Sequence, residues 1–327
     1  MKRQAIAVVI LLSFVGTAVA DYQLVRTIGT TGSGNGQFNG PQDLAVDSLG
    51  NVWVVEKDNN RIQEFDNQGN FLRTIGGRGS GNGQFSSPQD VAIDSFDNVW
   101  VADSSNNRIQ KFSSSGVYLG QFGTYGSGDG QIDDAEGVAV DGAGNIWVAD
   151  WWNNRIQKFT DTGTYLAKSG DSSRGGSGDG QFAWLGSLAT DSSGNVWVAD
   201  ANNDRIQEFN SDAEFLRTLG TDGGGNGQFA FPRSIAIDAS DNIWVAEAWN
   251  HRIQKFDSNG NFLMKFSTGG SADGVAVDRW GNVWVANYWD DCIQVFSVPE
   301  PSSLVLLVLV AASLSAYTWR RRAKGQR

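Results

Sequence analysis

One tryptophan-containing segment recurs six times along this chain, and this repetition restricts the possible folds more than any other feature. The copy at residues 145–159 reads NIWVADWWNNRIQKF. The repeated tryptophans are Trp53, Trp100, Trp147, Trp197, Trp244 and Trp284. They are separated by 47, 47, 50, 47 and 40 residues, and a period of roughly 20 to 50 residues is typical of solenoids, propellers and arrays. The fold must therefore be assembled from copies of one unit.

Each copy predicts four short β-strands and no helix. In the second copy, the expected strands are residues 89–94, 99–102, 108–112 and 118–122, separated by turns rich in Gly, Asn, Asp and Ser. This pattern is typical of an antiparallel meander, and no segment has helical periodicity. Because the run at 99–102 is apolar on both faces, each sheet needs a neighbour on both sides, which a ring of blades provides.

The residues of the repeat resemble a known family. Most copies carry a hydrophobic-Ala-hydrophobic-Asp segment, then Asn-Val/Ile-Trp-Val, an acid, an Asn-rich turn and Arg-Ile-Gln-Lys/Glu-Phe. The chain therefore resembles the NHL repeat over residues 22–296. This resemblance implies an all-β fold, a six-bladed β-propeller with four-stranded antiparallel blades.

The ends of the repeat region predict how the ring closes. The last copy stops at Phe296, one strand short, whereas residues 22–28 precede the first copy and resemble the outer strands at 71–75 and 215–219. We expect the N-terminal strand to complete the last blade. This pairing would remove a long exposed sheet edge.

An acid and an arginine change together between the copies. The acid ends the second strand of five copies and the arginine opens the third, whereas the sixth copy has Asn287 and Cys292. This joint loss predicts an ion pair across the hairpin that belongs to the scaffold; a role facing a ligand is the alternative. If partly exposed, each pair would contribute about 0.2–1 kcal/mol. The pairs are Glu56/Arg61, Asp103/Arg108, Asp150/Arg155, Asp200/Arg205 and Glu247/Arg252.

The N-terminus has the pattern of a secretory signal peptide. A basic start is followed by an apolar run and by Ala18-Val19-Ala20, which fits a cleavage site before Asp21. We therefore expect residues 1–20 to be removed and residues 21–297 to form the propeller. A retained membrane helix or a buried strand is the alternative.

The C-terminal residues 298–327 predict a membrane segment. An apolar run at 304–319 precedes a basic cluster, and its length is near the roughly 20 residues that span a bilayer. The positive-inside rule places the basic cluster in the cytoplasm and the propeller outside. The basic cluster begins with Arg320, Arg321 and Arg322.

A short motif precedes this run. Pro299, Glu300 and Pro301, then the apolar run and the arginines, resemble a PEP-CTERM sorting signal. The resemblance implies handling by an exosortase-type enzyme in a Gram-negative bacterium, in systems that concern the envelope and exopolysaccharide. We expect a protein that is membrane-anchored or released to the cell surface. A plain tail anchor is the alternative.

Composition excludes several classes of function. The full chain has 25 Lys+Arg and 36 Asp+Glu, of which seven basic residues and one acidic residue lie in the two ends. Residues 21–297 therefore keep 18 basic and 35 acidic residues, a net charge of −17. Such an acidic body should repel nucleic acid. The only cysteine, Cys292, allows no internal disulfide. It is expected to fill the space of the missing arginine rather than to act as a reactive thiol.

Catalytic and cofactor signals are weak. His251 is the only histidine and stands in a turn where other copies have Asn or Asp, so a His-rich zinc site is not available. We expect no cofactor and no enzyme activity; a propeller lyase or hydrolase is the alternative. The Gly-rich loops, such as residues 126–132, lack the lysine of a phosphate-binding loop. They are expected to connect blades, with glycine supplying positive φ and Phe or Ile anchoring the loop.

Large aromatic residues gather in polar turns of some copies only. They are expected to share one face of the propeller, where variable loops can form a binding surface. Aromatic faces beside Asp and Asn suit sugar rings, so extracellular polysaccharide is one expected ligand; a protein partner and loops that pack on one another are the alternatives. These residues are Trp151, Trp152, Trp184, Trp249, Tyr288 and Trp289.

A cation such as Ca²⁺ at the channel mouth is a weaker hypothesis. Asp43, Asp90, Glu136 and Asp273 lie where the inner strands begin, and carboxylates are suitable Ca²⁺ ligands. Arg233 stands at the same place in its copy and argues against a cation. Solvated rim charges are the favoured interpretation.

Overall fold

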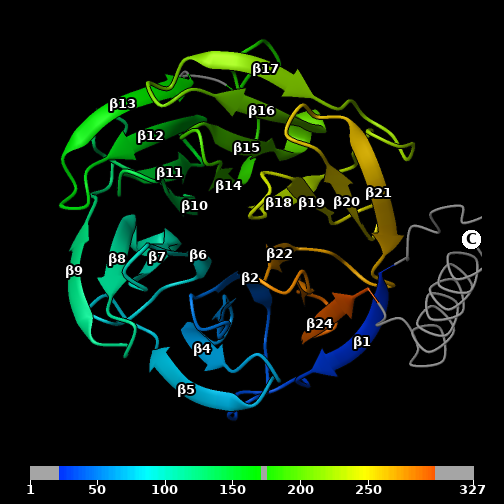
Figure 1. Ribbon diagram of the computed structural model, residues 1–327. Helices are drawn as coiled ribbons and strands as arrows, with labels where there is room; N and C mark the ends of the chain where they lie inside the picture. The colour runs from blue at the N-terminus through cyan, green and yellow to red at the C-terminus, as the bar shows by residue number, and fades with distance from the viewer. Residues whose placement is uncertain (1–21, 171–174, 299–327) are drawn as a thin grey trace, which may run out of the picture. The chain divides into compact units, whose positions relative to one another are not determined.

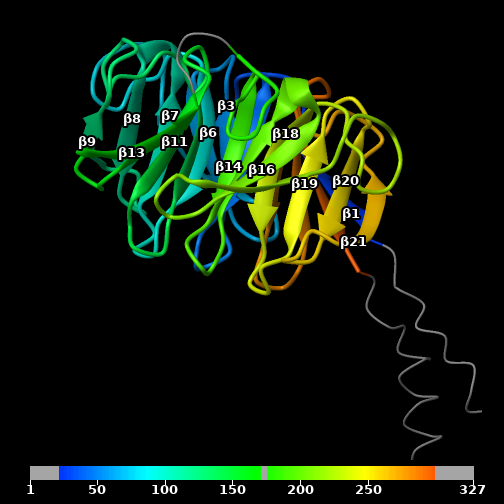
Figure 2. The ribbon, with the colours of Figure 1, turned by 90° about the horizontal axis from the view of Figure 1, so that it is seen from above.

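The computed structural model describes residues 22–170 and 175–298. Six four-stranded sheets stand as blades around a central axis (Figure 1). Seen from the side, the blades lie next to one another and their strands run between the two ends of the ring (Figure 2). The predicted six-bladed all-β propeller is thus confirmed.

The first three blades are each formed by one continuous stretch of chain. In the second copy, each predicted strand agrees with the structure to within one residue at either end. From the axis outward, the blades are β2 (Pro41–Val46), β3 (Val52–Glu56), β4 (Arg61–Phe65) and β5 (Phe71–Gly76); β6 (Pro88–Ile93), β7 (Val99–Asp103), β8 (Arg108–Phe112) and β9 (Tyr118–Phe122); and β10 (Ala135–Val140), β11 (Ile146–Asp150), β12 (Arg155–Phe159) and β13 (Tyr165–Gly170).

The sixth blade is closed by the N-terminal strand. The order β22-β23-β24-β1 places residues from both ends of the propeller in one sheet, as predicted. The remaining blades are β14 (Leu185–Thr190), β15 (Val196–Asp200), β16 (Arg205–Phe209) and β17 (Phe215–Leu219); β18 (Pro232–Ile237), β19 (Ile243–Glu247), β20 (Arg252–Phe256) and β21 (Phe262–Ser267); and β22 (Gly274–Val277), β23 (Val283–Asn287), β24 (Cys292–Ser297) and β1 (Gln23–Ile28).

In two blades, the turn between the second and third strands contains a short 3-10 helix. These are η1 (Ser104–Asn106) in blade two and η2 (Ala201–Asn203) in blade four. Each ends in a residue with left-handed backbone, Asn107 or Asp204, which is the conformation that Asn and Asp tolerate better than most residues. The left-handed conformation required at the end of these turns therefore explains why the repeat has Asn or Asp there.

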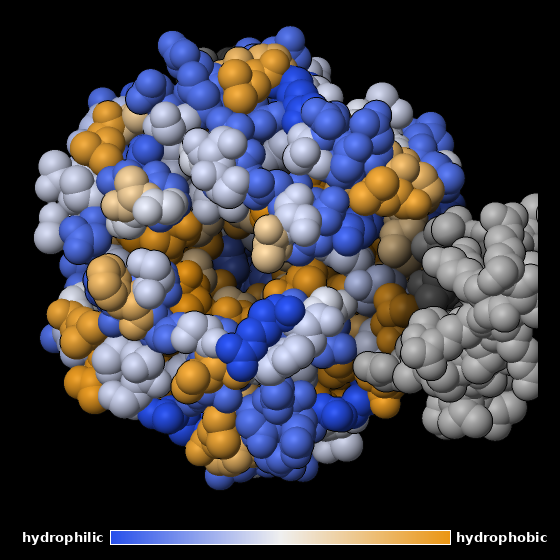
Figure 3. All heavy atoms as spheres, in the orientation of Figure 1, coloured by the Kyte–Doolittle hydropathy of each residue, from blue (hydrophilic) through white to orange (hydrophobic). Residues whose placement is uncertain are grey.

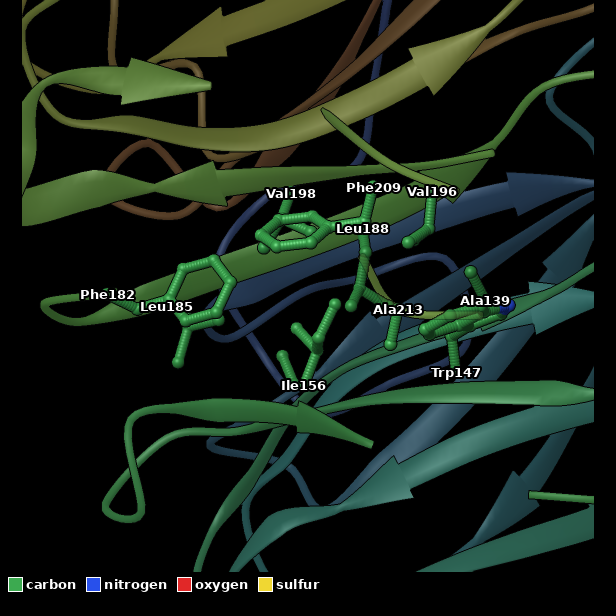
Figure 4. Packing of buried hydrophobic residues seen from close by; sticks show 11 residues of the cluster. Ala139, Trp147, Ile156, Phe182, Leu185, Leu188, Val196, Val198, Phe209 and Ala213 are labelled. Atoms are coloured by element: carbon green, nitrogen blue, oxygen red, sulfur yellow. The ribbon is translucent and has the colours of Figure 1, made fainter. Parts of the chain in front are cut away.

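The repeated tryptophan fills the space between neighbouring blades. Trp147 and Ile156 of blade three share one buried cluster with Leu188 and Phe209 of blade four, and the Trp147 ring lies beside Ala213 (Figure 4). All six repeated tryptophans are at most 2% exposed. Burial of such large apolar rings is a major stabilising term, so the blades are held together by the same residue that defines the repeat.

The predicted ion pairs form in all five copies, but they are buried rather than partly exposed. The Asp150 carboxylate and the Arg155 guanidinium lie 2.7 Å apart, and their side chains are 0% and 1% exposed. The Arg155 fork also donates to the carbonyls of Ser127, Gly128 and Gln131 in the preceding Gly-rich loop. The expected contribution of about 0.2–1 kcal/mol for an exposed pair therefore does not apply.

The Gly-rich loops connect blades, as predicted. In the loop before blade three, Gly130 has a φ of +79°, which favours glycine. Ile132, at the end of this loop, is fully buried. The amide of Gln157 in β12 bonds to two adjacent residues near the end of the loop, since it accepts from the Gly130 N–H and donates to the Gln131 carbonyl. A short loop is thereby attached to the third strand.

Two sets of predicted features lie outside the described residues. These are the signal peptide at 1–20 and the sorting tail with Pro299, Glu300, Pro301, Arg320, Arg321 and Arg322. Within residues 22–170 and 175–298, no helix is both long enough and apolar enough to cross a membrane.

Candidate functional site at the channel mouth

The candidate site lies at the end of the central channel where the inner strands begin, here called the mouth. The loop entering each blade and the turn between its second and third strands meet at this end, because the strands are antiparallel. In a space-filling view the ring is hollowed at its centre (Figure 3). The mouth thus combines a cavity with the most variable segments of the repeat.

Irregular pairing directs side chains into the mouth. In β10, Ala135 pairs with Asp150 and Gly137 with Ala149, so Glu136 between them is left out of the ladder. The same shift occurs at Arg233 in β18. Bulges of this kind re-aim a side chain and are frequent beside functional sites.

The residue that precedes each of the first five inner strands has left-handed backbone. In blade one it is glycine, Gly40, but the other blades place a side chain there despite the cost of this conformation. Non-glycine residues held in this region often mark ligand-binding sites. Aligning the copies at Gly40 would have identified these four residues from the sequence, but the sequence analysis selected only Trp184. They are Ser87, Asp134, Trp184 and Phe231, with φ of +49°, +66°, +56° and +52°.

Two of the predicted aromatic residues form the wall of a first recess of about 300 Å³. The Trp151 and Trp184 rings meet edge to face with centroids 5.6 Å apart. The same recess also has hydroxyl and charged groups of both signs. Its lining includes Lys57, Ser104, Ser105, Asp134, Glu136, Phe231 and Arg233.

A second recess of about 340 Å³ lies beside the first. Trp249 and Trp289 line it, and Trp249 stacks on Phe231 with centroids 4.8 Å apart and planes 13° apart. Phe231 and Arg233 line both recesses. They therefore form a shared wall, although the sequence reasoning did not select Phe231. His251 lines the second recess, with Ala248, Ser271 and Asp273.

The other two predicted aromatic residues lie outside the two recesses. Trp152 packs on Trp151 with centroids 4.4 Å apart and is 58% exposed. Tyr288 packs on Trp289 at 5.0 Å and donates its hydroxyl to Asp58 of blade one at 3.0 Å. Trp152 and Tyr288 thus support the aromatic walls from outside, and packing between loops accounts for part of the aromatic set.

Arg233 links acids of blades three and six at the mouth. Its guanidinium lies 3.2 Å from the Asp273 carboxylate and 3.6 Å from that of Glu136, and it contacts the Gln42 amide. The acids are not solvated rim charges, contrary to the sequence interpretation: Asp273 is 1% exposed and Asp43 6%. The Arg233 guanidinium, rather than solvent, therefore balances the charges of Glu136 and Asp273.

Burial raises the pKa of several acids at the mouth. Desolvation raises the pKa of Glu136, although Arg233 and Lys57 oppose the shift. It also raises the pKa of Asp134 and that of Asp43, to about 7. No set of three His, Cys, Asp or Glu side chains within 22–170 and 175–298 is arranged to hold a metal ion. The mouth is thus a mixed aromatic and polar surface with titratable groups.

Two families match parts of this chain. The NHL repeat model matches residues 38–65, 85–112, 133–159 and 229–256, which lie in copies one, two, three and five. The model of the PEP-CTERM protein-sorting motif matches residues 297–322. This motif indicates export and cell-surface association in Gram-negative bacteria through exosortase-type machinery.

Curated relatives are similar over one repeat only. Protein lin-41 of Caenorhabditis elegans is 44% identical over 48 residues, which are 15% of this chain and 4% of that protein. NHL repeat-containing protein 3 of Homo sapiens is 41% identical over 46 residues, 14% of this chain and 13% of that protein. The matched segments therefore span a small part of either relative.

Solved propellers share the fold at low identity. One is a catalytically inactive virginiamycin B lyase from Staphylococcus aureus with quinupristin, at 16% identity and a TM-score of 0.61, covering 85% of this chain and 100% of that chain. Another is a gluconolactonase from Xanthomonas campestris, at 13% identity and a TM-score of 0.63. That match covers 81% of this chain and 88% of the gluconolactonase chain. The chain thus carries NHL repeats on a six-bladed β-propeller and a PEP-CTERM protein-sorting motif after it.

Proposed function

We propose that this protein is an exported binding scaffold whose mouth recognises a carbohydrate chain. The observation that carries the proposal is the pair of aromatic-walled recesses that meet at Phe231 and Arg233. Their volumes lie at the lower end of the range for small-molecule sites. Because the two recesses adjoin, they suit consecutive units of one chain rather than two separate ligands.

The chemistry of the first recess favours an uncharged sugar. Trp151 and Trp184 offer apolar faces on which the C–H face of a sugar ring can stack. Lys57 and Arg233 are matched by Asp134 and Glu136, so the recess carries both signs of charge and no strong excess. Such a surface provides donors and acceptors for hydroxyl groups. Export by the sorting motif would bring this surface into contact with extracellular polysaccharide.

Calorimetric titration of the purified protein with neutral and acidic bacterial polysaccharides tests the proposal. Trp184→Ala and Trp249→Ala each remove one aromatic wall and should weaken binding about tenfold or more. Trp280→Ala is the matched control, because Trp280 is 51% exposed like Trp184 but lies in a turn at the other end of the channel. Absence of binding by the folded protein, or an equal loss in Trp280→Ala, would reject the proposal and direct the search to protein partners.

A lyase or hydrolase is a second candidate. Burial raises the pKa of Asp134 and Glu136 in the first recess, and a raised carboxyl pKa suits a general acid near neutral pH. If this candidate holds, incubation with a bound polysaccharide should release new chain ends. Glu136→Gln should then abolish that release while leaving binding intact; unchanged polysaccharide after prolonged incubation excludes the activity.

A further inference from the structure

We infer that the end of the propeller opposite the mouth lies against a lipid bilayer through three exposed apolar side chains. These are Trp280, Leu49 and Phe96, here called the apolar arc, and they are 51%, 69% and 83% exposed. The arc is separate from both recesses of the proposed function and needs no carbohydrate ligand. It rests instead on the expectation, drawn from the sequence, that residues 304–319 enter a membrane.

The side chains of the arc occupy one position in three successive blades. Each is the third residue of the turn between the first and second strands, and these turns lie at the end opposite the mouth. Because the ring is closed, blade six adjoins blade one, and the arc runs over blades six, one and two. The other three blades have Ala143, Ser193 and Ser240 at this position. The turn therefore folds without an apolar tip, and the tips are confined to one half of this end.

Contacts between the turns hold the arc together. The Arg279 guanidinium of blade six donates to the Ser48 carbonyl of blade one at 2.9 Å. The Ser48 N–H and hydroxyl donate to the Asp97 carboxylate of blade two at 2.8 and 2.6 Å. The Trp280 ring covers Gly50 so closely that a Cβ there would lie 2.5 Å from it. The three turns are therefore linked and present their apolar side chains as one patch, which is typical of interaction sites.

The chemistry of the arc favours a bilayer surface over a protein partner. Each apolar side chain stands at the tip of a turn, so the arc offers protrusions rather than a pocket for a partner's anchor residue. Tryptophan is enriched where a membrane meets water. Arg279 is the only basic residue in the six turns, and its guanidinium lies 4.4 Å from the centroid of the Trp280 ring. Apolar tips beside a cation match acyl chains beneath phosphate groups.

The chain itself would bring this end of the propeller to a membrane. β24 runs antiparallel to β23, so it ends at the end opposite the mouth, in the same blade as Trp280. Only residues 299–303 separate Val298 from the apolar run that starts at Leu304. A fully extended chain of this length spans at most about 20 Å. Insertion of the run would therefore hold this end of blade six within that distance of the bilayer.

Tryptophan quenching in vesicles tests the inference. The full chain is reconstituted into phosphatidylcholine vesicles whose acyl chains carry bromine near the headgroup, where it quenches tryptophans in contact with them. Trp319 stands at the end of the apolar run, so Trp319→Phe should lose part of the quenching if the run is in the bilayer. In that background, Trp280→Phe should lose a further part. Trp249→Phe, which removes an exposed tryptophan at the mouth, should lose none.

Dye labels show which half of this end touches lipid. Burial raises the pKa of the Cys292 thiol to about 11, so a new exposed cysteine can be labelled selectively at neutral pH. In vesicles, a polarity-sensitive dye on Leu49→Cys or Phe96→Cys should emit at a shorter wavelength than the same dye on Ser193→Cys. Ser193 is the matched control, because it is exposed and holds the equivalent position in blade four. All three substitutions change exposed turn residues and leave the core intact.

Three results would overturn the inference. Quenching of Trp319 without quenching of Trp280 would show a membrane tether whose propeller stands away from the bilayer. Equal emission from the labels at Leu49, Phe96 and Ser193 would show that the arc makes no selective contact, and a protein partner would then account for it. Absence of quenching at Trp319 would remove the tether on which the inference rests. None of these results bears on carbohydrate binding at the mouth, which the calorimetric titration tests separately.

Discussion

Removing one arginine from a blade should destabilise the propeller far more than its single charge would suggest. In Arg155→Met, the Asp150 carboxylate stays buried at 0% exposure without its counter-ion. Three loop carbonyls also lose the arginine as a donor, at 2.8, 2.9 and 2.9 Å, although the Gln131 carbonyl keeps the Gln157 amide. Breaking a buried ion pair from one side typically costs about 3–5 kcal/mol, and we expect a loss in that range.

The same blade provides an exposed ion pair as a control. Lys168 and Asp129 lie 2.5 Å apart, but their side chains are 42% and 52% exposed. Exposed pairs contribute about 0–1 kcal/mol, so Lys168→Met should change the free energy of unfolding by no more than that. Both variants remove one positive charge from the same blade, and hence the difference between them isolates burial.

Blade six suggests a second comparison. It carries Asn287 and Cys292 where other blades have the acid and the arginine. Introducing this pair into blade three, as Asp150→Asn with Arg155→Cys, removes the uncompensated charge together with its partner. The double variant should therefore be more stable than Arg155→Cys alone, by about 1–3 kcal/mol.

Urea unfolding measures all four variants. Fluorescence of the thirteen tryptophans and circular dichroism should give coincident transitions before a free energy is derived. The argument fails if Arg155→Met costs no more than Lys168→Met. It also fails if the double variant is less stable than Arg155→Cys, because the buried carboxylate would then not be the source of the cost.

Three further predictions concern the thiol, the ring closure and a loop. Burial, then Asp290 and Asp291, raise the pKa of the Cys292 thiol to about 11. Alkylation at pH 8 should therefore be about 200-fold slower than for a thiol with a pKa of about 8.5. The rate should increase as pH rises toward 10, and a rate independent of pH would contradict this. Deleting residues 22–28 removes β1 and leaves the outer edge of β24 without a partner strand, although β24 stays paired with β23, so calorimetry should show a lower Tm and light scattering should show association. Gly36→Ala, at φ +74° with open space around its Cβ, should cost about 1–2 kcal/mol, whereas Gly120→Ala in β9 should be neutral; equal effects would contradict the backbone argument.

The repeat made most of the fold predictable. Six copies of one pattern determine the strands, the blade number and the closing role of residues 22–28, because each copy repeats the same apolar spacing. The joint change at Asn287 and Cys292 identified the ion pairs without any structure. Their burial was missed, since a single hairpin does not reveal that a Gly-rich loop from the preceding connection covers the arginine.

The candidate site was less predictable. Trp151, Trp184, Trp249 and Trp289 stood out as large aromatic residues in polar turns, but Phe231 looked like an ordinary loop residue. Its contact with Trp249 depends on a left-handed backbone, which the sequence reveals only through alignment with Gly40. The role of Arg233 depends on a bulge that the apolar pattern does not encode.

Differences between the two ends of the channel explain why the mouth is the functional candidate. At the other end, the turn aspartate of each blade accepts from the asparagine four residues later, as Asp238 does from Asn242. In every blade except the third it also accepts from the repeated tryptophan, as Asp238 does from the Trp244 indole at 3.0 Å. At the mouth, equivalent positions hold Gln42, Gln89, Glu136, Gly186, Arg233 and Asp273. Copies that need only to fold have no reason to differ in charge at one position, whereas a ring that surrounds a ligand gains specificity from such differences. The divergence of the copies at the mouth, set against the uniformity of the turn aspartates at the other end, is therefore itself an argument for binding at the mouth.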